Sequence, residues 1–555
     1  MFPAADAYGS TRAATIRRAL RGNRPVSKNA IFFLIDALRY DTVADLAAAR
    51  DLIPNIAALA ERGIVRRAVA NAQSTQMVMP AIYSLTYPLD YDGYNTGIRN
   101  RPKSFVEVLR EAGYDTHLAA SCNQLGVTHG YDRGFAHRHT SVDCRHILEY
   151  LINKVLSYEL DLWRSGERSE ADTIAVLQRE LSLLLDAVAE LAAGREARIW
   201  SPRLRRINGR LAAGCPAEKD LLMRSPQAVL RKLTRIPAGL YWRYLGRTDT
   251  RGLLLARAAE SVRWRTRTWI APTRFPFLLM SYYETKADAV IAGVRAIVRQ
   301  APRPWYVHLH VMDVHDCRSL SRPLFVLKSL RFLPRWLRAR SAGKTSRHFT
   351  YDLALMAVDH EFGKLVDELK RNGQVDDTVI LITGDHGSSW AESPRAKQPI
   401  AGRTHYEDIE VPIVVFGDGR RPSDQGMIDS MGISATLLDT LGLPPHASFK
   451  GRSMFGPGRK AVITETAGAG NADLERRDLH FTVTGPTHKL MAVLKGNRLS
   501  ARALYDLVAD PKELRNVAED PANSPIVDSL MRHLREERFE LFKMRGLDMQ
   551  REAVS

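Results

Sequence analysis

Acidic and histidine side chains follow several short apolar runs of the chain. Asp36 ends the run "FFLID", and Asp385 and His386 come directly after "ILITG". Carboxylate oxygens together with an imidazole suit Zn²⁺ or Mn²⁺, and three protein ligands leave a coordination position open. One aspartate after a strand is more often a helix cap than a ligand, but two of them, one followed by His and Gly, favour a site. The pattern predicts one divalent ion held by Asp36, Asp385 and His386, with Mg²⁺ or Ca²⁺ and a second ion as open alternatives.

Hydroxyl groups close to such an ion would be candidate nucleophiles. The segment "NAQSTQMVMPAIYSLTYP" offers Ser74, Thr75 and Ser84. A hydroxyl is a weak nucleophile until a metal ion lowers its pKa. Thr75 precedes a helix expected to begin near Pro80, whose amide dipoles would help to hold an anionic ester. Ordinary helix capping is the alternative role of Ser74 and Thr75.

The apolar runs that precede these residues have the length and composition of buried parallel strands. They cover residues 31–35 and 379–382, "PWYVHLHV" and "VPIVVF", and helical patterns such as "KSFVEVLREAGY" lie between them. Strands alternating with helices predict an α/β fold, a mostly parallel sheet with helices on both faces. Ligands of such sheets bind at the carboxyl ends of the strands, where the candidate residues lie.

The composition along the chain predicts five regions. A basic, Leu- and Ala-rich helical insertion interrupts the α/β core, and short strand-like pieces followed by a helix form a small C-terminal α+β subdomain. The predicted regions are an N-terminal extension (1–25), the first part of the core (26–146), the insertion (147–283), the second part of the core (284–460) and the C-terminal subdomain (461–555).

Positive charge is concentrated in two stretches of a chain whose formal net charge is +18. Residues 201–270 hold 16 Lys/Arg and 4 Asp/Glu, and residues 318–347 hold nine Lys/Arg and no acid. Such surfaces attract anions. The amphipathic stretch 322–340 is either an interfacial helix on an anionic membrane or a lid packed on its own enzyme. We expect both basic stretches to form a rim on the active-site side of the sheet.

Targeting signals are not recognisable in the sequence. The four cysteines are far apart without a CxxC pair, the arginine-containing first 25 residues lack an apolar signal-peptide core, and no apolar window is long enough to span a membrane. We therefore expect a cytoplasmic protein, soluble or peripheral at the membrane. The sequence carries no signal of oligomeric state.

Several motifs together resemble the sulfatase family of the alkaline phosphatase superfamily. "FFLIDALRYDTV", "MPAIYSLTYP", "GYDRGFAHR", "ILITGDHGSS" and "ALYDLVADPKELRNVAED" occur in the order seen in sulfatases and related phosphotransferases. Sulfatases carry a C/S-x-P-x-R motif whose first residue becomes formylglycine, but Val78 and Ile82 occupy these positions around Pro80. The resemblance therefore implies an alkaline-phosphatase-like fold, metal dependence and no formylglycine.

The spacing around Pro80 is similar to that of enzymes with a threonine nucleophile. Thr75 lies five residues before Pro80, as in lipid A phosphoethanolamine transferases, and the set with Asp36, Asp385 and His386 resembles their one-metal site and that of lipoteichoic acid synthases. The position of Asp36 is usually Glu in those enzymes. The resemblance implies that Thr75 forms a covalent intermediate and lies within coordination reach of the metal, with Ser74 and Ser84 as weaker alternatives.

The same resemblance suggests further site residues. We expect catalytic roles for His315 and His405 and substrate binding by His310 and Asp313. Weaker candidates for anion contacts are Lys103, Arg39, His117 and His129.

The resulting functional hypothesis is a metal-dependent hydrolase or transferase of a phosphodiester or sulfate ester. The substrate is expected to be an anionic glycan or a lipid-linked ester, and nucleic acid is not expected. A formylglycine-independent sulfatase is the first alternative. A catalytically silent protein that binds an anionic polymer is an alternative of another class.

Overall fold

A computed structural model describes most of the chain. The described residues are 28–121, 129–194, 200–270, 286–315, 330–345, 348–389, 404–422, 426–468 and 471–547. The predicted N-terminal extension, 1–25, lies outside them. Among the described helices, none is both long and apolar enough to cross a bilayer.

The centre of the fold is an eight-stranded sheet with the order β4-β3-β5-β1-β6-β7-β2-β8. All neighbouring pairs are parallel except those of β7, which runs antiparallel to both β6 and β2. The strands are β1 (Asn29–Ile35), β2 (Ile64–Val69), β3 (Asp115–Ala120), β4 (His137–Thr140), β5 (Trp305–Val311), β6 (Thr378–Thr383), β7 (Glu410–Phe416) and β8 (Ile428–Asp429). The expected mostly parallel sheet is confirmed.

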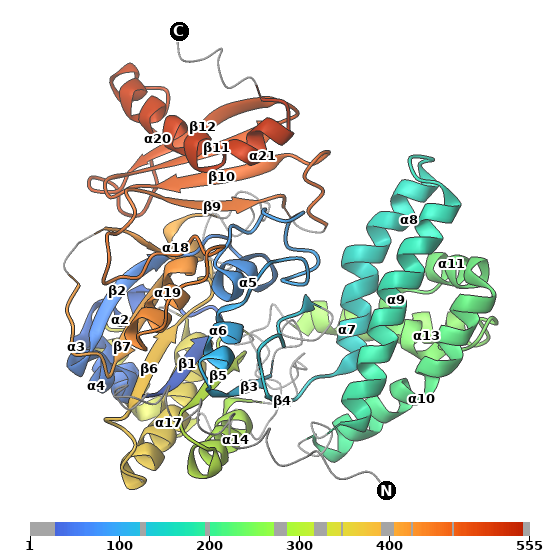
Figure 1. The fold of residues 1–555 in the computed structure, drawn as a ribbon, viewed down its shortest axis with the longest axis horizontal. Helices are drawn as coiled ribbons and strands as arrows, with labels where there is room; N and C mark the ends of the chain where they lie inside the picture. Colours follow the sequence, from blue (N-terminus) through green and yellow to red (C-terminus); the bar gives the residue numbers. More distant parts are fainter. Residues whose placement is uncertain are drawn as a thin grey trace, which may run out of the picture.

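The three central strands β5, β1 and β6 are buried along their whole length, as their continuous apolar sequences require. Helices cover both faces of the sheet (Figure 1). One face packs against α3 (Leu46–Leu52), α4 (Pro54–Arg62), α14 (Ala287–Gln300), α16 (Leu333–Ser341) and α17 (Phe349–Arg371). The other face packs against α5 (Thr75–Ser84), α6 (Phe105–Glu111) and α19 (Ser430–Thr440). Alternation of side chains along β1 divides the core, so that Phe33 stacks on Phe362 of α17 and Phe32 lies beside Phe105 of α6.

The predicted insertion is a helical unit beside the sheet, drawn in teal and green in Figure 1. It has a hydrophobic core of its own, built from leucines of several helices. The helices begin slightly before the predicted boundary, and the positions from 271 to 283 are not described. The elements are α7 (Cys144–Leu151), a π-helical turn (Ile152–Leu156), α8 (Ser157–Arg164), α9 (Glu170–Ala193), α10 (Pro202–Arg224), α11 (Pro226–Arg235), α12 (Ala238–Tyr241), a 3₁₀ turn (Trp242–Tyr244) and α13 (Leu253–Ile270).

The C-terminal residues form a four-stranded antiparallel sheet with the order β12-β11-β10-β9. Its first strand is bound to the chain that leads from β2 into α5: Glu465 N donates to Asn71 O at 2.8 Å, and Asn71 Nδ2 donates to Ile463 O at 2.9 Å. The elements are β9 (Val462–Thr466), β10 (Leu479–Thr484), β11 (His488–Lys495), β12 (Arg498–Asp506), a 3₁₀ turn (Pro521–Asn523), α20 (Ser524–Glu537) and α21 (Phe539–Met544).

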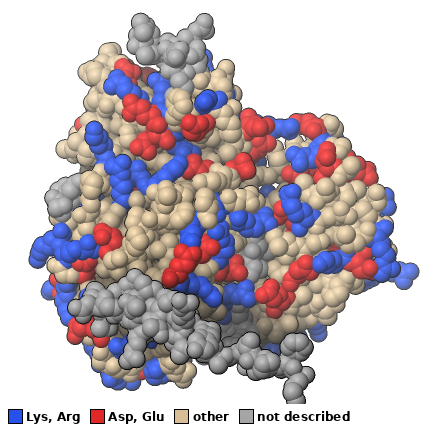
Figure 2. Space-filling view, in the orientation of Figure 1, with Lys and Arg blue, Asp and Glu red and all other residues tan. Residues whose placement is uncertain are grey.

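The described part of the basic stretch, from residue 330 onward, packs on the protein itself. Trp336 of α16 is buried, and its Nε1 donates to Asp352 Oδ2 at 2.9 Å. Leu337 on the same helix is half exposed. Residues 322–329, which belong to the predicted amphipathic stretch, lie outside the described residues. On the face drawn in Figure 2, Lys and Arg side chains are interspersed with Asp and Glu.

Candidate active site

Two neighbouring strands bring the predicted metal ligands together. Asp36 directly follows β1, and Asp385 and His386 follow β6, so the parallel pairing of these strands places all three at one edge of the sheet. One ligand atom from each of them lies within 4.8 Å of the others, and all three side chains are buried. His386 Nε2 is 3.5 Å from Asp385 Oδ2 and 3.7 Å from Asp36 Oδ1.

Thr75 points into this cluster. Its Oγ1 donates to Asp36 Oδ2 at 3.0 Å and lies 3.2 Å from His386 Nε2. Thr75 is the first residue of α5, so the expectation that the helix begins near Pro80 is wrong, and Pro80 lies inside the helix. The earlier start places Thr75 itself among the unpaired amides of the first turn, where an anionic group is stabilised.

The two alternative hydroxyls are less favourably placed. Ser74 is the residue before α5 and borders the same cavity, but its side chain makes no capping hydrogen bond. Ser84 is the last residue of α5; its Oγ is buried and donates to Pro80 O at 2.7 Å. Ser84 therefore lies at the opposite end of α5 from Thr75, and its hydroxyl bonds the helix backbone.

The backbone around the site is tightly constrained. Ala37 has a φ of 61°, a left-handed conformation that L-residues rarely adopt, and its N–H donates to Asp385 Oδ1 at 3.1 Å. Gly387, directly after His386, lies so close to the next loop that an added Cβ would be 2.1 Å from Glu407 O. The glycine of the "DHG" motif thus allows residues 404–408 to approach the predicted metal ligands.

His310 joins the buried cluster from β5. Its Nε2 donates to Asp36 Oδ2 at 3.3 Å, and its ring is fully buried. Burial disfavours the charge of Asp36, but His315, His310 and His386 outweigh this and hold the pKa of Asp36 well below its usual value. Burial also opposes the charge of His386, while Asp385 and Asp36 raise its pKa above the usual value. The site is therefore an anionic centre balanced by imidazoles.

The buried carboxylates fit a cation. Asp36 Oδ1 and Asp385 Oδ2 are both buried without a hydrogen-bond partner, which is rare for charged oxygens in a folded protein. A divalent ion between them would satisfy both oxygens, and His386 would supply the nitrogen ligand.

A cavity of about 340 Å³ opens above the cluster. The insertion contributes to its wall: Tyr150 comes from α7 and Lys154 from the π-helical turn. Sequence reasoning expected the insertion on this side of the sheet but did not single out these two residues. The cavity is lined by Gln73, Ser74, Thr75, Gln76, Met77, Tyr150, Lys154, His315, His386, Gly387, Ser388, Ser389 and Asp408.

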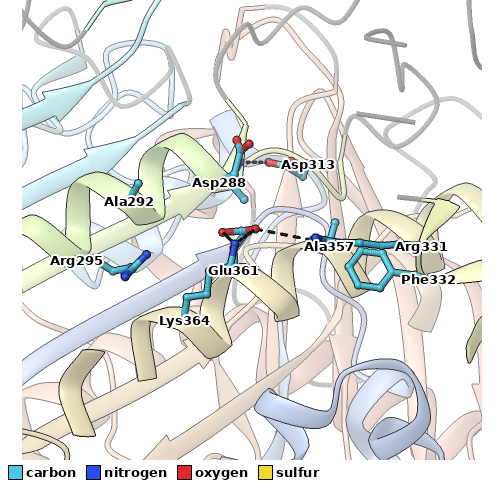
Figure 3. Close-up of a pocket in the computed structure, with 10 residues that line it drawn as sticks. Asp288, Ala292, Arg295, Asp313, Arg331, Phe332, Ala357, Glu361 and Lys364 are labelled. Atoms are coloured by element: carbon cyan, nitrogen blue, oxygen red, sulfur yellow. Dashed lines mark hydrogen bonds and ion pairs between the residues drawn. The ribbon is translucent and has the colours of Figure 1, made fainter. Parts of the chain in front are cut away.

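Asp313 lies elsewhere. Its Oδ2 accepts a hydrogen bond from Ala287 N at 2.9 Å, at the start of α14. It borders a second cavity of about 410 Å³ between α14 and α17, together with Asp288, Glu361 and Lys364 (Figure 3). His315, two residues later, instead lines the cavity beside Thr75. The two candidate side chains of the loop after β5 therefore lie in different cavities, Asp313 at the start of α14 and His315 beside Thr75.

The remaining predicted residues do not line the cavity. His405 is buried, and its Nδ1 donates to Glu513 Oε2 of the C-terminal region at 2.8 Å. Lys103 pairs with Glu111 on α6. Arg39 pairs with Asp41, and its Nη1 donates to the backbone of the cavity residue Ser388 at 3.2 Å. The two weaker histidines also lie outside the lining: His117 is on β3, and His129 packs against the Tyr131 and Tyr150 rings.

Comparison with known proteins decides the family. The family model described as "Sulfatase" matches residues 28–182 and 256–443, more than half of the chain. The chain belongs to the sulfatase family. The predicted resemblance is confirmed, and the gap between the two matched segments falls inside the helical insertion.

Curated relatives of this sulfatase-family chain are distant. A multifunctional alkaline phosphatase superfamily protein, PehA of Trinickia caryophylli, is 23% identical over 197 residues, 32% of this chain and 37% of that protein. An endo-4-O-sulfatase of Bacteroides thetaiotaomicron is 26% identical over 268 residues, 43% of this chain and 52% of that protein. The chain thus spans about a third to a half of these relatives.

Solved structures share the fold over nearly the whole chain. The phosphonate monoester hydrolase of Agrobacterium radiobacter has a TM-score of 0.51 at 16% identity, covering 93% of this chain and 96% of that one. A 2-O GAG sulfatase has a TM-score of 0.51 at 14% identity, covering 94% of both chains. At these identities the likeness establishes the architecture only.

Proposed function

We propose that this sulfatase-family protein hydrolyses a phosphate, phosphonate or sulfate ester with Thr75 as the nucleophile. The observation that carries the proposal is the position of Thr75 Oγ1, 3.0 Å from Asp36 Oδ2 and 3.2 Å from His386 Nε2, at the start of a helix and on the wall of a cavity. A divalent ion held by Asp36, Asp385 and His386 would supply positive charge beside the nucleophile and the ester oxygens.

In the first half of the reaction, Thr75 Oγ1 bonds to phosphorus or sulfur while the ester oxygen leaves. The Thr75 hydroxyl, whose pKa a bound ion would lower, loses its proton to solvent before the attack, and Asp36 Oδ2, which accepts the Thr75 hydrogen bond, orients Oγ1. His315, on the cavity wall, gives a proton to the leaving oxygen. The amides at the start of α5 and the ammonium group of Lys154 bind the anionic oxygens of the ester.

In the second half, water attacks phosphorus or sulfur and the bond to Thr75 breaks. The now neutral His315 takes the proton from the water, and Thr75 leaves as the oxyanion with which the first half began. Val78 and Ile82, which occupy the positions of the formylglycine motif, are buried aliphatic side chains, and this supports a covalent intermediate on Thr75 instead. Release of the phospho or sulfo group from Thr75 therefore depends on water in a hydrolase. In a transferase an acceptor hydroxyl would take the place of that water.

We infer that the substrate is an anionic glycan ester. The insertion, which we treat as a recognition unit spanning residues 147–283, supplies a tyrosine and a lysine to the cavity. Aromatic faces and cations suit a sugar that carries an anionic group. The curated relatives named as an endo-4-O-sulfatase and an N-acetylglucosamine-6-sulfatase are consistent with this class.

The test combines metal analysis with a panel of substrates. We expect purified protein to hold one divalent ion per chain at the active site and to cleave at least one of three aryl esters: a phosphodiester, a phosphonate monoester and a sulfate. Removal of the ion with a chelator should abolish turnover, and re-addition should restore it. Metal-loaded protein that cleaves none of the three and instead binds a sulfated glycan unchanged would support the silent binding protein.

A further inference from the structure

A second group of potential metal ligands lies on β3 and β4, where β4 is the outermost strand of the sheet. Asp115 and His117 come from β3 and His137 from the neighbouring strand β4, and one ligand atom of each lies within 4.8 Å of the others. Asp115 and His137 are the first residues of their strands, so the group lies toward the amino ends of β3 and β4, whereas the Thr75 site lies at the carboxyl ends. This group is separate from the proposed active site and no step of the proposed reaction uses it.

The strand register explains why these side chains meet. Asp115 and His117 are two residues apart and project from the same face of the sheet. His137 is the register partner of His117 across the parallel pair, so their rings stack with centroids 4.6 Å apart. His117 Nε2 and His137 Nε2 donate to the two oxygens of Asp115 at 2.9 and 3.0 Å.

A third histidine completes the group. His139 lies two residues after His137 on the same face, and its Nε2 is 3.3 Å from His117 Nδ1. On binding an ion, His117 would give up the Nε2 proton that it donates to Asp115 here, and a proton on its Nδ1 would donate to His139 Nε2. Metal-bound histidines are oriented by such a contact.

We propose that Asp115, His117 and His137 bind a first-row transition-metal ion of the Zn²⁺ type, with His139 as the residue that orients His117. Ligands about 2.0–2.1 Å from a tetrahedral ion are about 3.3 Å apart. The two histidine nitrogens are 2.9 and 3.0 Å from different oxygens of Asp115, and one ligand atom of each residue lies within 4.8 Å of the others, so small side-chain rotations would bring the three ligands to that spacing. The His137 side chain is 40% exposed, which gives the ion a route from solvent and leaves room for water as the fourth ligand.

The ion would fasten a weakly attached strand. In the part of the chain that the structure describes, β4 has four residues, lies at the edge of the sheet and pairs with β3 alone. The chain enters the helical insertion directly after it, at α7. A link between Asp115 and His117 of β3 and His137 of β4 would hold the insertion against the core, and through it the cavity residues Tyr150 and Lys154.

The experiment is metal uptake by the full chain, measured by equilibrium dialysis against micromolar Zn²⁺ and by the visible spectrum of the Co²⁺ form. We compare the wild type with His137→Gln, which changes a partly exposed ligand, and with His480→Gln, a matched histidine on another strand. Asp385→Asn identifies uptake at the proposed active site. Asp115→Asn provides a second variant that keeps the shape of the ligand it replaces.

We expect His137→Gln and Asp115→Asn each to lose one equivalent of metal and the tetrahedral Co²⁺ bands, with uptake by His480→Gln unchanged. The His137-dependent equivalent should remain in Asp385→Asn. His139→Phe should keep the site but weaken its affinity about 10- to 100-fold. Equal uptake by the wild type and folded His137→Gln, or an affinity unaffected by His139→Phe, would overturn the corresponding assignment.

Discussion

The sharpest test of the proposed active site is to remove one of two adjacent hydroxyls. Thr75 and Ser74 both border the cavity, but only Thr75 contacts Asp36 and His386. Thr75→Ala removes the proposed nucleophile, and water cannot take its place in the same geometry. Loss of an enzymatic nucleophile lowers kcat by up to about 10⁶, so we expect a fall of at least about 10⁴.

The structure also sets the stability cost. Thr75→Ala leaves Asp36 Oδ2 with His310 as its remaining hydrogen-bond donor, so we expect a loss of about 1–3 kcal/mol in the free energy of unfolding. Ser74 makes no capping hydrogen bond, so Ser74→Ala should cost less than about 0.5 kcal/mol and keep kcat within a few-fold. Thr75→Ser, which retains the hydroxyl, should preserve measurable turnover.

The assay is steady-state hydrolysis of the best aryl ester, with circular dichroism to establish folding. Rapid acid quenching followed by mass spectrometry should find the phospho or sulfo group on Thr75 in the wild type and nowhere in the peptide of Thr75→Ala. The reasoning is refuted if folded Thr75→Ala keeps near-normal kcat while Ser74→Ala loses it. That result would move the nucleophile by one residue and leave the family assignment intact.

Three further predictions concern the metal, the substrate and pH. Asp385→Asn should lower the affinity for the active-site ion and reduce kcat/KM by at least about 100-fold, measured with and without excess metal, because it removes one charged ligand. Lys154→Met should raise KM about tenfold or more through loss of one charged contact, while Lys219→Met, on the exposed face of α10, should leave KM unchanged. Burial lowers the pKa of His129 from 6.5 to about 4, so the folded state binds fewer protons than the unfolded state between these values. The stability that this residue contributes is fully present above pH 6.5 and is lost as pH falls toward 4. The free energy of unfolding should fall by about 2 kcal/mol between pH 7 and pH 5 for this reason. His129→Phe should reduce this pH dependence, measured by urea unfolding.

The cluster of Asp36, Asp385 and His386 could be predicted because the positions of these residues follow from local sequence. Continuous apolar runs specify β1 and β6, and a parallel sheet brings the residues after such strands to one edge. Asp36, Asp385 and His386 therefore had to lie close together once the sheet was predicted. The strand pattern did not place Thr75, because a hydroxyl before a helix has no strand to fix its position. Its position near the three residues was expected from the family resemblance.

Side-chain direction in loops could not be predicted. Asp313 and His315 follow β5 at nearly the same distance along the chain, yet one caps α14 and the other faces the cavity. Pro80 suggested a helix start because proline favours first turns, but α5 accommodates it in its interior. Lys154 was missed because its position depends on the π-helical turn, which shifts the side chains that follow α7 and has no sequence signature of its own.

The contact between His405 and Glu513 joins positions 108 residues apart. Glu513 Oε1 also accepts a hydrogen bond from Tyr406 N at 3.1 Å, so one buried carboxylate holds the loop that carries the cavity residue Asp408. A nascent chain on the ribosome therefore cannot finish this wall of the cavity until the C-terminal sheet has been synthesised. A chain that stops before residue 513 would contain Thr75 and its neighbours but would lack the carboxylate that holds this loop.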